Sequence, residues 1–196
     1  MLDDPDDLAV LEGVIGLAAA FHRQVIAEGV ETVEHGAMLL QLGCELAQGY
    51  AIAHPMPAHE LPAWSAAWHP DPAWAGLRSV RRNDLPVLHA LVEHRAWIVA
   101  IESFLKEERE APPPLDHHQC SFGKWLEGEG LARYGAKLPF PAIEALHRQV
   151  HALAVDLLEL QARGRSPEAL ARLGELHDMR DALLGQLKAV GQEDRR

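Results

Sequence analysis

Three stretches in the second half of the chain carry apolar residues at alternating steps of three and four positions. This spacing lines up side chains along one face of an α-helix, which then packs against other helices. The first two sets are Val87, Leu91, His94, Ile98, Ile101 and Leu105, and Ile143, Leu146, Val150, Leu153, Leu157 and Leu160. The third set follows the favourable helix start Ser166-Pro167 and comprises Leu170, Leu173, Leu176, Leu183, Leu187 and Val190. We expect an all-α helical bundle over residues 85–190, preceded by a linker at 65–84 and followed by a frayed tail at 191–196.

The first 64 residues follow a different pattern, in which helical and extended segments alternate. Residues 8–18 carry one apolar helix face, and Val33–Leu42 forms a second helical segment that ends at Gly43. Gln24–Ala27 and Ala47–Ala53 have the composition of short buried strands. Such alternation predicts parallel strands with helices packed outside them.

Composition and charge exclude several classes of partner. The 196 residues include 18 Lys and Arg against 29 Asp and Glu, a formal net charge of −11, and no basic block is long enough to follow a nucleic-acid backbone. The apolar run Val14–Phe21 is too short for a transmembrane helix or a signal peptide. We therefore expect no nucleic-acid partner, no membrane association and a cytoplasmic location. There, Cys44 and Cys120 are expected to stay reduced, with Cys44 as a small buried residue.

Cys120 has the richer chemical context of the two cysteines, because three histidines in predicted helices can reach it. His147 and His151 are four residues apart and project from one side of a helix, each one position after an apolar seam residue. His94 lies within the first seam, where an imidazole without a partner would cost free energy. One thiolate and three imidazoles are a ligand set typical of tetrahedral zinc. The sequence predicts a zinc site of His94, Cys120, His147 and His151.

Other histidines and a metal-free interpretation compete with this assignment. His117 and His118 flank Cys120 on a proline-rich loop, where they are either outer partners of the site or merely exposed. His177 interrupts the last apolar stripe, and His89 lies off the first seam. In the metal-free alternative the histidines are incidental and the bundle is a dimerisation module. The leucine-rich seams favour a homodimer with or without zinc.

Three motifs occur in order along the predicted bundle. They are His94-x-x-Trp97, Cys120-x-Phe122-Gly123-Lys124-Trp125 and His147-x-x-x-His151. Together they resemble the chemoreceptor zinc-binding (CZB) domain, a small bundle found on chemoreceptors and cyclic-di-GMP enzymes, with Phe122 where that family often has leucine. The resemblance covers about residues 85–190. It implies a regulatory zinc site of the four residues named above, in which the Cys120 ligand exchanges or oxidises as a signal.

A second group of motifs lies near the start of the chain. It comprises Ala27-Glu28-Gly29-Val30-Glu31-Thr32, Leu42-Gly43-Cys44, Gln48-Gly49-Tyr50 and Pro55-Met56-Pro57. These motifs closely resemble the C-terminal end of the EAL-type cyclic-di-GMP phosphodiesterase barrel. In that family, carboxylates at the C-terminal ends of the strands hold two divalent ions that activate water. Glu28 matches a family carboxylate and Gln48 an active-site glutamine, but the Glu-Ala-Leu signature and the remaining metal ligands are absent.

The resemblances imply a mixed fold, with a truncated α/β (TIM-type) barrel fragment at residues 1–64 followed by the helical bundle. Two strands cannot close a barrel, so this segment is expected to belong to a longer parent. The expected function is zinc-dependent sensing in cyclic-di-GMP signalling, with Glu28 and Gln48 as remnants of an incomplete and inactive site. Alternatively, the parent is an active cyclic-di-GMP phosphodiesterase, a hydrolase that zinc gates. Only a complete parent would bind cyclic-di-GMP and Mg²⁺ or Mn²⁺.

Overall fold

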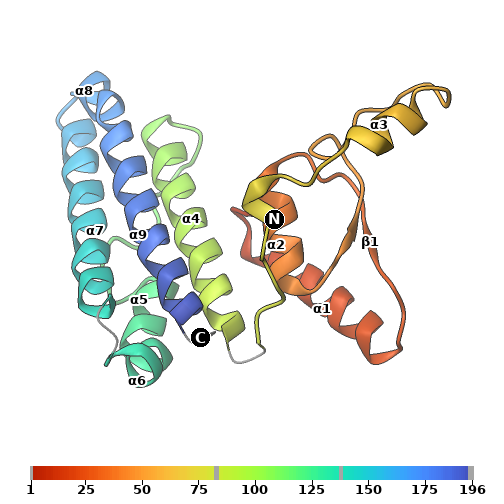
Figure 1. Cartoon of the computed structure of the whole chain (residues 1–196). Coiled ribbons are helices and arrows are strands. Elements are labelled where there is room, and N and C mark those ends of the chain that lie inside the picture. Colours follow the sequence, from red (N-terminus) through yellow and green to blue (C-terminus); the bar gives the residue numbers. More distant parts are fainter. Residues whose placement is uncertain (1, 82–83, 137–138, 194–196) are drawn as a thin grey trace. The chain divides into compact units, whose positions relative to one another are not determined.

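The computed structural model describes residues 2–81, 84–136 and 139–193, with side chains of the last helix as far as Leu187. The chain divides into two compact units, one comprising Asp6–Leu85 and the other running from Pro86 onward. The described residues are mostly helical and include only two strands, each two residues long (Figure 1). The helical second half agrees with the predicted bundle, whereas the strands are shorter than predicted.

The first unit contains a parallel strand pair with helices before and between the strands. Its elements are α1 (Pro5–Ala20), β1 (Ile26–Ala27), α2 (Val33–Leu42) and β2 (Leu46–Ala47). The register places Ile26 opposite Leu46. Helix α2 begins after Thr32, whose Oγ1 accepts the His35 N–H at 3.2 Å, and ends at Gly43 in the left-handed conformation. The predicted limits of α2 are therefore confirmed.

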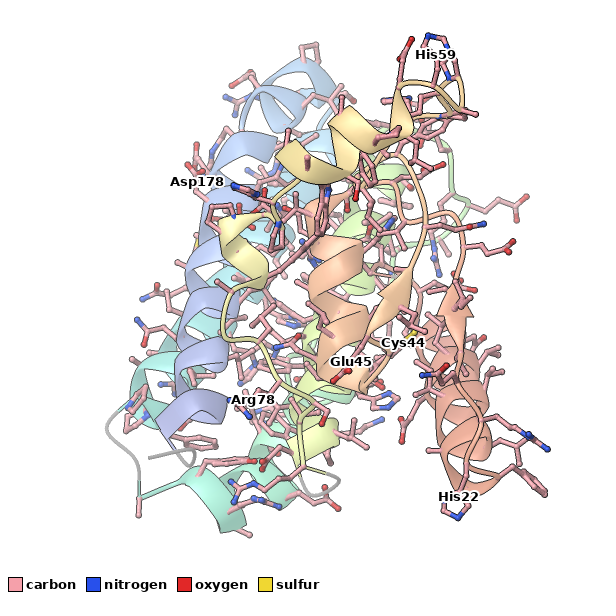
Figure 2. All side chains as sticks on the ribbon, turned by 45° about the vertical axis from the view of Figure 1, so that its right-hand side comes forward. His22, Cys44, Glu45, His59, Arg78 and Asp178 are labelled. Atoms are coloured by element: carbon pink, nitrogen blue, oxygen red, sulfur yellow. The ribbon has the colours of Figure 1, made fainter. Side chains whose placement is uncertain are left out.

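A small core holds the strands and helices of this unit together. It consists of buried Val30, Leu39 and Cys44, against which Leu11, Ile15, Val25, Ala27, Ala47 and Ala51 pack. The Cys44 thiol (Figure 2) donates to the carbonyl oxygen of Leu46 at 3.3 Å. Cys44 is thus a small buried residue, as the sequence predicts.

The predicted strand Ala47–Ala53 is wrong beyond Ala47, because the chain turns there. The Ile52 N–H donates to the Gly49 carbonyl at 2.9 Å, which closes the turn. Gly49 has a φ of 154°, and a Cβ atom at this position would lie 2.3 Å from the backbone of Val30. Only glycine permits this approach. The Ala51 N–H still reaches the Val30 carbonyl at 2.9 Å, so apolar residues stay near the core without extending the strand.

The segment predicted to be a linker overlaps one short helix and contains a second helical element, which packs on α2. They are α3 (Leu61–Ala67) and the 3₁₀ turn η1 (Pro72–Trp74). The Trp74 indole N–H donates to the Val33 carbonyl at 2.7 Å. Its ring lies over Gly36, where a Cβ atom would come within 2.6 Å of the indole. Trp74 thus holds this segment against α2, although the sequence there has no helical or strand periodicity.

The second unit is a bundle of long helices closed by shorter elements at one end. Helices α4 (Leu85–Leu105), α7 (Phe140–Ala162) and α9 (Leu173–Glu193) lie side by side, and α8 (Ser166–Ala171) precedes α9 (Figure 1). The short elements are α5 (Ser121–Trp125), a π-helical turn (Leu126–Gly130) and α6 (Leu131–Tyr134). The loop from α4 to α5 brings Cys120 beside the long helices.

The buried face of the bundle follows the predicted seams at most positions. Seam residues with buried side chains are Val87, Leu91, His94, Ile98, Ile101, Leu105, Ile143, Val150, Leu153, Leu157, Leu173, Leu176, Leu183 and Leu187. Leu146 and Leu160 are half-buried. The prediction is wrong for Leu170, which is 38% exposed, because α8 ends at Ala171 and buries Ala169 instead. The side chain of Val190 lies outside the described residues.

Helix α9 runs further than predicted, to Glu193, so residues 191–193 are helical rather than a frayed tail. The last three positions of the predicted tail lie outside the described residues. In the part of the chain that the structure describes, no helix combines the length and apolar character needed to cross a bilayer.

Candidate metal centre

His94 is the most unusual polar residue of the bundle core. It lies on α4 and is only 1% exposed. Both of its ring nitrogens are buried and have no hydrogen-bond partner. A neutral polar group left in this state costs about 1–3 kcal/mol of folding free energy. The cost indicates that the imidazole has a partner of another kind, such as a bound cation.

His147 and His151 come from the facing helix α7 and complete a group of three. They are 2% and 3% exposed, so both lie in the core although each follows an apolar seam residue by one position. One ring nitrogen from each of the three histidines lies within 4.8 Å of those of the other two. Ligand nitrogens of a tetrahedral zinc ion are about 3.3 Å apart, given Zn–N distances of about 2.0 Å. Small side-chain movements bring the three nitrogens to that spacing.

Cys120 does not belong to this group of atoms, but its sulfur atom lies beside one member of it. Its Sγ lies 3.2 Å from Nε2 of His147. A sulfur and a nitrogen on one tetrahedral zinc ion are about 3.6 Å apart, so this pair has nearly the spacing of two ligands. Cys120 is the N-cap of α5, where its Sγ accepts the Gly123 N–H at 3.1 Å. That N–H also favours a thiolate at this position.

Gly123 lets the Cys120 turn close against the preceding loop. A Cβ atom at this position would lie 1.7 Å from the carbonyl oxygen of His117. The same carbonyl accepts the Cys120 thiol at 3.4 Å. Any larger residue at position 123 would push the loop away and displace the sulfur from His147.

The backbone of the loop fixes the orientation of His151. Its Nδ1 lies 2.8 Å from the Leu115 carbonyl oxygen, so Nδ1 carries the proton and donates. This leaves Nε2, which is buried and has no hydrogen-bond partner, as the ligand atom. The sequence contains no signal for this hydrogen bond, because its acceptor is a backbone carbonyl.

Aromatic rings pack against the three histidines. Trp97 is stacked on His94 with ring centroids 5.9 Å apart and lies 4.0 Å from the His151 ring. Phe122 lies edge-on to His147 at 4.8 Å. The Trp97 indole N–H donates to the Pro114 carbonyl at 2.8 Å, which ties the loop to α4. The rings make the surroundings of the histidines largely apolar, which strengthens electrostatic interactions there.

Burial sets the protonation states of the four groups. It lowers the pKa of His94 to about 3 and that of His147 to about 2, and it also lowers the pKa of His151. It raises the pKa of the Cys120 thiol. The histidines are therefore neutral at physiological pH, which is the form that binds metal ions. A dication would supply the positive charge that a thiolate needs in this apolar setting, so the donor set fits zinc.

The competing histidines have other surroundings. His177 on α9 pairs with Glu102 of α4, with Nε2 and Oε2 3.1 Å apart. His89 is half-buried and is not part of the group around His94. His117 and His118 belong with Asp116 to a second group of metal-ligating atoms, also within 4.8 Å of one another. The sequence places two of these side chains near Cys120 but does not single out Asp116.

In the first unit, Glu28 and Gln48 occupy equivalent positions at the ends of the two strands. Glu28 directly follows β1 and Gln48 directly follows β2, and both are exposed. The Gln48 N–H donates to the Ala27 carbonyl at 2.8 Å, which extends the strand pairing by one bond. Among the described residues, Glu28 does not belong to a group of three or more metal-ligating side chains. The two residues share one edge of the strand pair but do not form a complete site.

Comparisons with known proteins divide the chain at similar places. Residues 94–158 match the chemoreceptor zinc-binding domain, and residues 1–55 match the EAL domain. Similar curated proteins include the oxygen sensor protein DosP of Escherichia coli, 40% identical over 60 residues, which are 31% of this chain and 8% of the relative. The cyclic di-GMP phosphodiesterase RocR of Pseudomonas aeruginosa is 44% identical over 57 residues, which are 29% of this chain and 14% of the relative.

The matched segment is thus a small part of each of these relatives. A further one is the probable cyclic di-GMP phosphodiesterase PdeD of Escherichia coli, 37% identical over 70 residues, which are 36% of this chain and 13% of the relative. No solved structure matches the chain significantly. The family matches fall on the two groups of residues described above, around Glu28 and Gln48 and around Cys120. The chain therefore contains a chemoreceptor zinc-binding domain at residues 94–158 and part of an EAL domain at residues 1–55.

Proposed function

We propose that the chain is a zinc-binding regulatory module of cyclic-di-GMP signalling. The observation that carries this proposal is the buried His94, whose two ring nitrogens lack partners beside the ligand atoms of His147 and His151. Zinc would be held by these three histidines and Cys120. It would supply the positive charge that stabilises the Cys120 thiolate. The match to a zinc-binding domain supports the choice of metal.

A site with four protein ligands suits regulation better than hydrolysis. Catalytic zinc sites usually have three protein ligands and keep one position open for water. In the proposed site Cys120 would serve as the fourth ligand, and Trp97 and Phe122 pack against the histidines. Occupancy then controls the position of α5 and its loop relative to α4 and α7, because the ligands come from all three segments. The bundle responds to zinc supply through this loop.

The second part of the proposal concerns the EAL segment. The likeness to cyclic di-GMP phosphodiesterases supports a place in that signalling system. Glu28 and Gln48 are exposed at one edge of a two-stranded sheet, and among the described residues Glu28 belongs to no group of three or more metal-ligating side chains. We propose that this segment is part of a barrel in a longer protein and does not hydrolyse cyclic-di-GMP alone. Zinc would then regulate the activity of that protein.

Zinc content tests the first part directly. The purified chain is expected to hold about one tightly bound zinc ion, and Cys120→Ala and His147→Ala are expected to lose it. Cys44→Ala and His89→Gln are matched controls, since each changes the same residue type outside the site. Elemental analysis after gel filtration measures the content. A wild-type chain without zinc at neutral pH would leave only a helical dimerisation module.

The same site is proposed to respond to oxidants through Cys120. A zinc-bound thiolate is nucleophilic, so hydrogen peroxide or hypochlorous acid would oxidise the sulfur and weaken its bond to the ion. We expect oxidant treatment to release zinc from the wild-type chain and equally from Cys44→Ala. A chromophoric zinc indicator measures the release. Unchanged zinc occupancy after Cys120 has been oxidised would contradict this response.

A further inference from the structure

A second set of metal-binding side chains lies outside the buried site, on the loop before α5. Asp116, His117 and His118 each offer one ligand atom, and these atoms lie within 4.8 Å of one another. Asp116 and His118 are exposed, and His117 is half-buried. Two imidazoles and one carboxylate form a donor set that favours divalent transition-metal ions over calcium and magnesium. The mixture of donors distinguishes this group from an ordinary acidic surface cluster.

The loop holds these donors in place without a metal ion. The carboxylate of Asp116 accepts the His118 backbone N–H at 3.0 Å and the Gln119 side-chain N–H at 3.2 Å. The preceding residues are also fixed, because the carbonyls of Pro114 and Leu115 accept from Trp97 and His151. A rigid loop loses little conformational entropy when it binds an ion.

A carboxylate from another element orients His118. Glu127 in the π-helical turn contacts Nδ1 of His118 through its Oε1. This contact leaves Nε2 as the ligand atom. Metal-ligating histidines commonly donate their second ring N–H to a carboxylate in this way, which fixes the ring and raises its basicity. Glu127 is nine residues beyond His118 in the chain, so the contact comes from the fold and not from the loop alone.

The exposed group lies directly beside the buried one. The His117 ring centroid is 6.0 Å from that of His147 and 6.2 Å from that of His151. We propose that Asp116, His117 and His118, with Glu127 orienting His118, form a second, solvent-exposed site for a divalent transition-metal ion. An ion bound there exchanges with solvent and lies next to the buried histidines. The second site thereby speeds the loading of the buried one.

Zinc titration of the full chain tests this site. In competition with a chromophoric chelator, the wild type is expected to bind two zinc ions, one tightly and one more weakly. His118→Gln should weaken the second ion at least about tenfold, in line with the loss of an oriented ligand, and leave the tight ion unchanged. Asp116→Asn should weaken the second ion as well. His59→Gln is the matched control, because His59 is an exposed histidine of the other unit (Figure 2).

A variant of the buried site keeps this test separate from the proposed function. His147→Ala should lose the tight ion and keep the weak one, and adding His118→Gln should then remove the weak ion too. The second site is overturned if the weak ion is missing from the wild type or if His59→Gln loses it equally. Stopped-flow mixing with zinc measures the loading rate of the tight site. A rate in His118→Gln equal to that of the wild type would overturn the role in loading.

Discussion

At the scale of single residues, the buried histidines lower the stability of the metal-free fold and raise its affinity for a metal ion. His94 gives up hydration without gaining a hydrogen bond within the protein. Such a residue destabilises the metal-free fold and stabilises the fold only when an ion is bound. The effects of a substitution should therefore have opposite signs in the two states.

His94→Leu tests this opposition. Without metal, the variant should be more stable than the wild type by about 1 kcal/mol, because two unpaired polar atoms leave the core. In the presence of zinc it should be the less stable of the two. Urea unfolding with chelator and with zinc measures both differences. His89→Leu, a half-buried position on the same helix, should show no reversal of sign.

The same burial makes the metal-free domain sensitive to acid. An unfolded histidine has a pKa of about 6.5, whereas the folded values for His94 and His147 are about 3 and about 2. Below about pH 6.5 the unfolded state therefore binds more protons, and stability falls as the pH falls. Each of these two histidines should cost about 1.4 kcal/mol at about pH 5.5. Urea unfolding of the chelated chain at several pH values measures this, and a stability that rises on acidification would contradict it.

At the scale of elements, the sequence predicts the helices of the second unit well, since a long apolar seam is compatible with only one secondary structure. The sequence predicts α2 equally well, because Gly43 marks its end. It fails where one contact decides the structure, as at Gly49, whose approach to Val30 ends the strand pairing. It also fails at Leu170, because α8 ends at Ala171, whereas the nearby Gly174 lies inside α9 and does not mark the break.

The candidate site also has a part that the sequence predicts and a part that it does not. The spacing of His147 and His151 and the seam position of His94 are enough, from the sequence alone, to indicate that the three side chains meet. The proton position on His151 and the role of Glu127 were not predictable, because they depend on a backbone carbonyl and on a contact across the loop. Zinc as the ion of the site and the homodimer both stay predictions.

Gly123 gives the sharpest test of the short element α5. Gly123→Ala should displace Cys120 and weaken zinc binding at least about tenfold, because the added Cβ atom would overlap the His117 carbonyl. Gly185→Ala in α9 is the matched control, since nothing lies within 4 Å of a Cβ atom there. The control should be neutral or stabilising by up to about 1 kcal/mol. Chelator competition and urea unfolding measure the two effects.

At the scale of the whole molecule, the two units should respond differently to metal removal. The buried ligands all lie in the second unit, and the core of the first unit consists of apolar residues and Cys44. Chelation should therefore lower the melting temperature of the second unit and leave that of the first unchanged. Differential scanning calorimetry with and without chelator measures both. A shift of the two transitions together would show that the units unfold as one.

The isolated chain is also expected to lack phosphodiesterase activity. Glu28 and Gln48 alone offer too few oxygen ligands for two divalent ions. Incubation with cyclic-di-GMP and Mn²⁺ should give no product above that of Glu28→Gln, as measured by chromatography. Hydrolysis that Glu28→Gln abolishes would instead establish an active site within this chain.

The ligands of the buried site are far apart in the chain, and this spacing affects the timing of a signal. Cys120 follows His94 by 26 residues and precedes His147 by 27, so a bound ion would close two long loops much as a crosslink does. Release of the ion would require these loops to open together with the helices that carry them. The bundle would then stay in its zinc-bound conformation after free zinc has fallen. It would do so for as long as the slowest step of its opening takes.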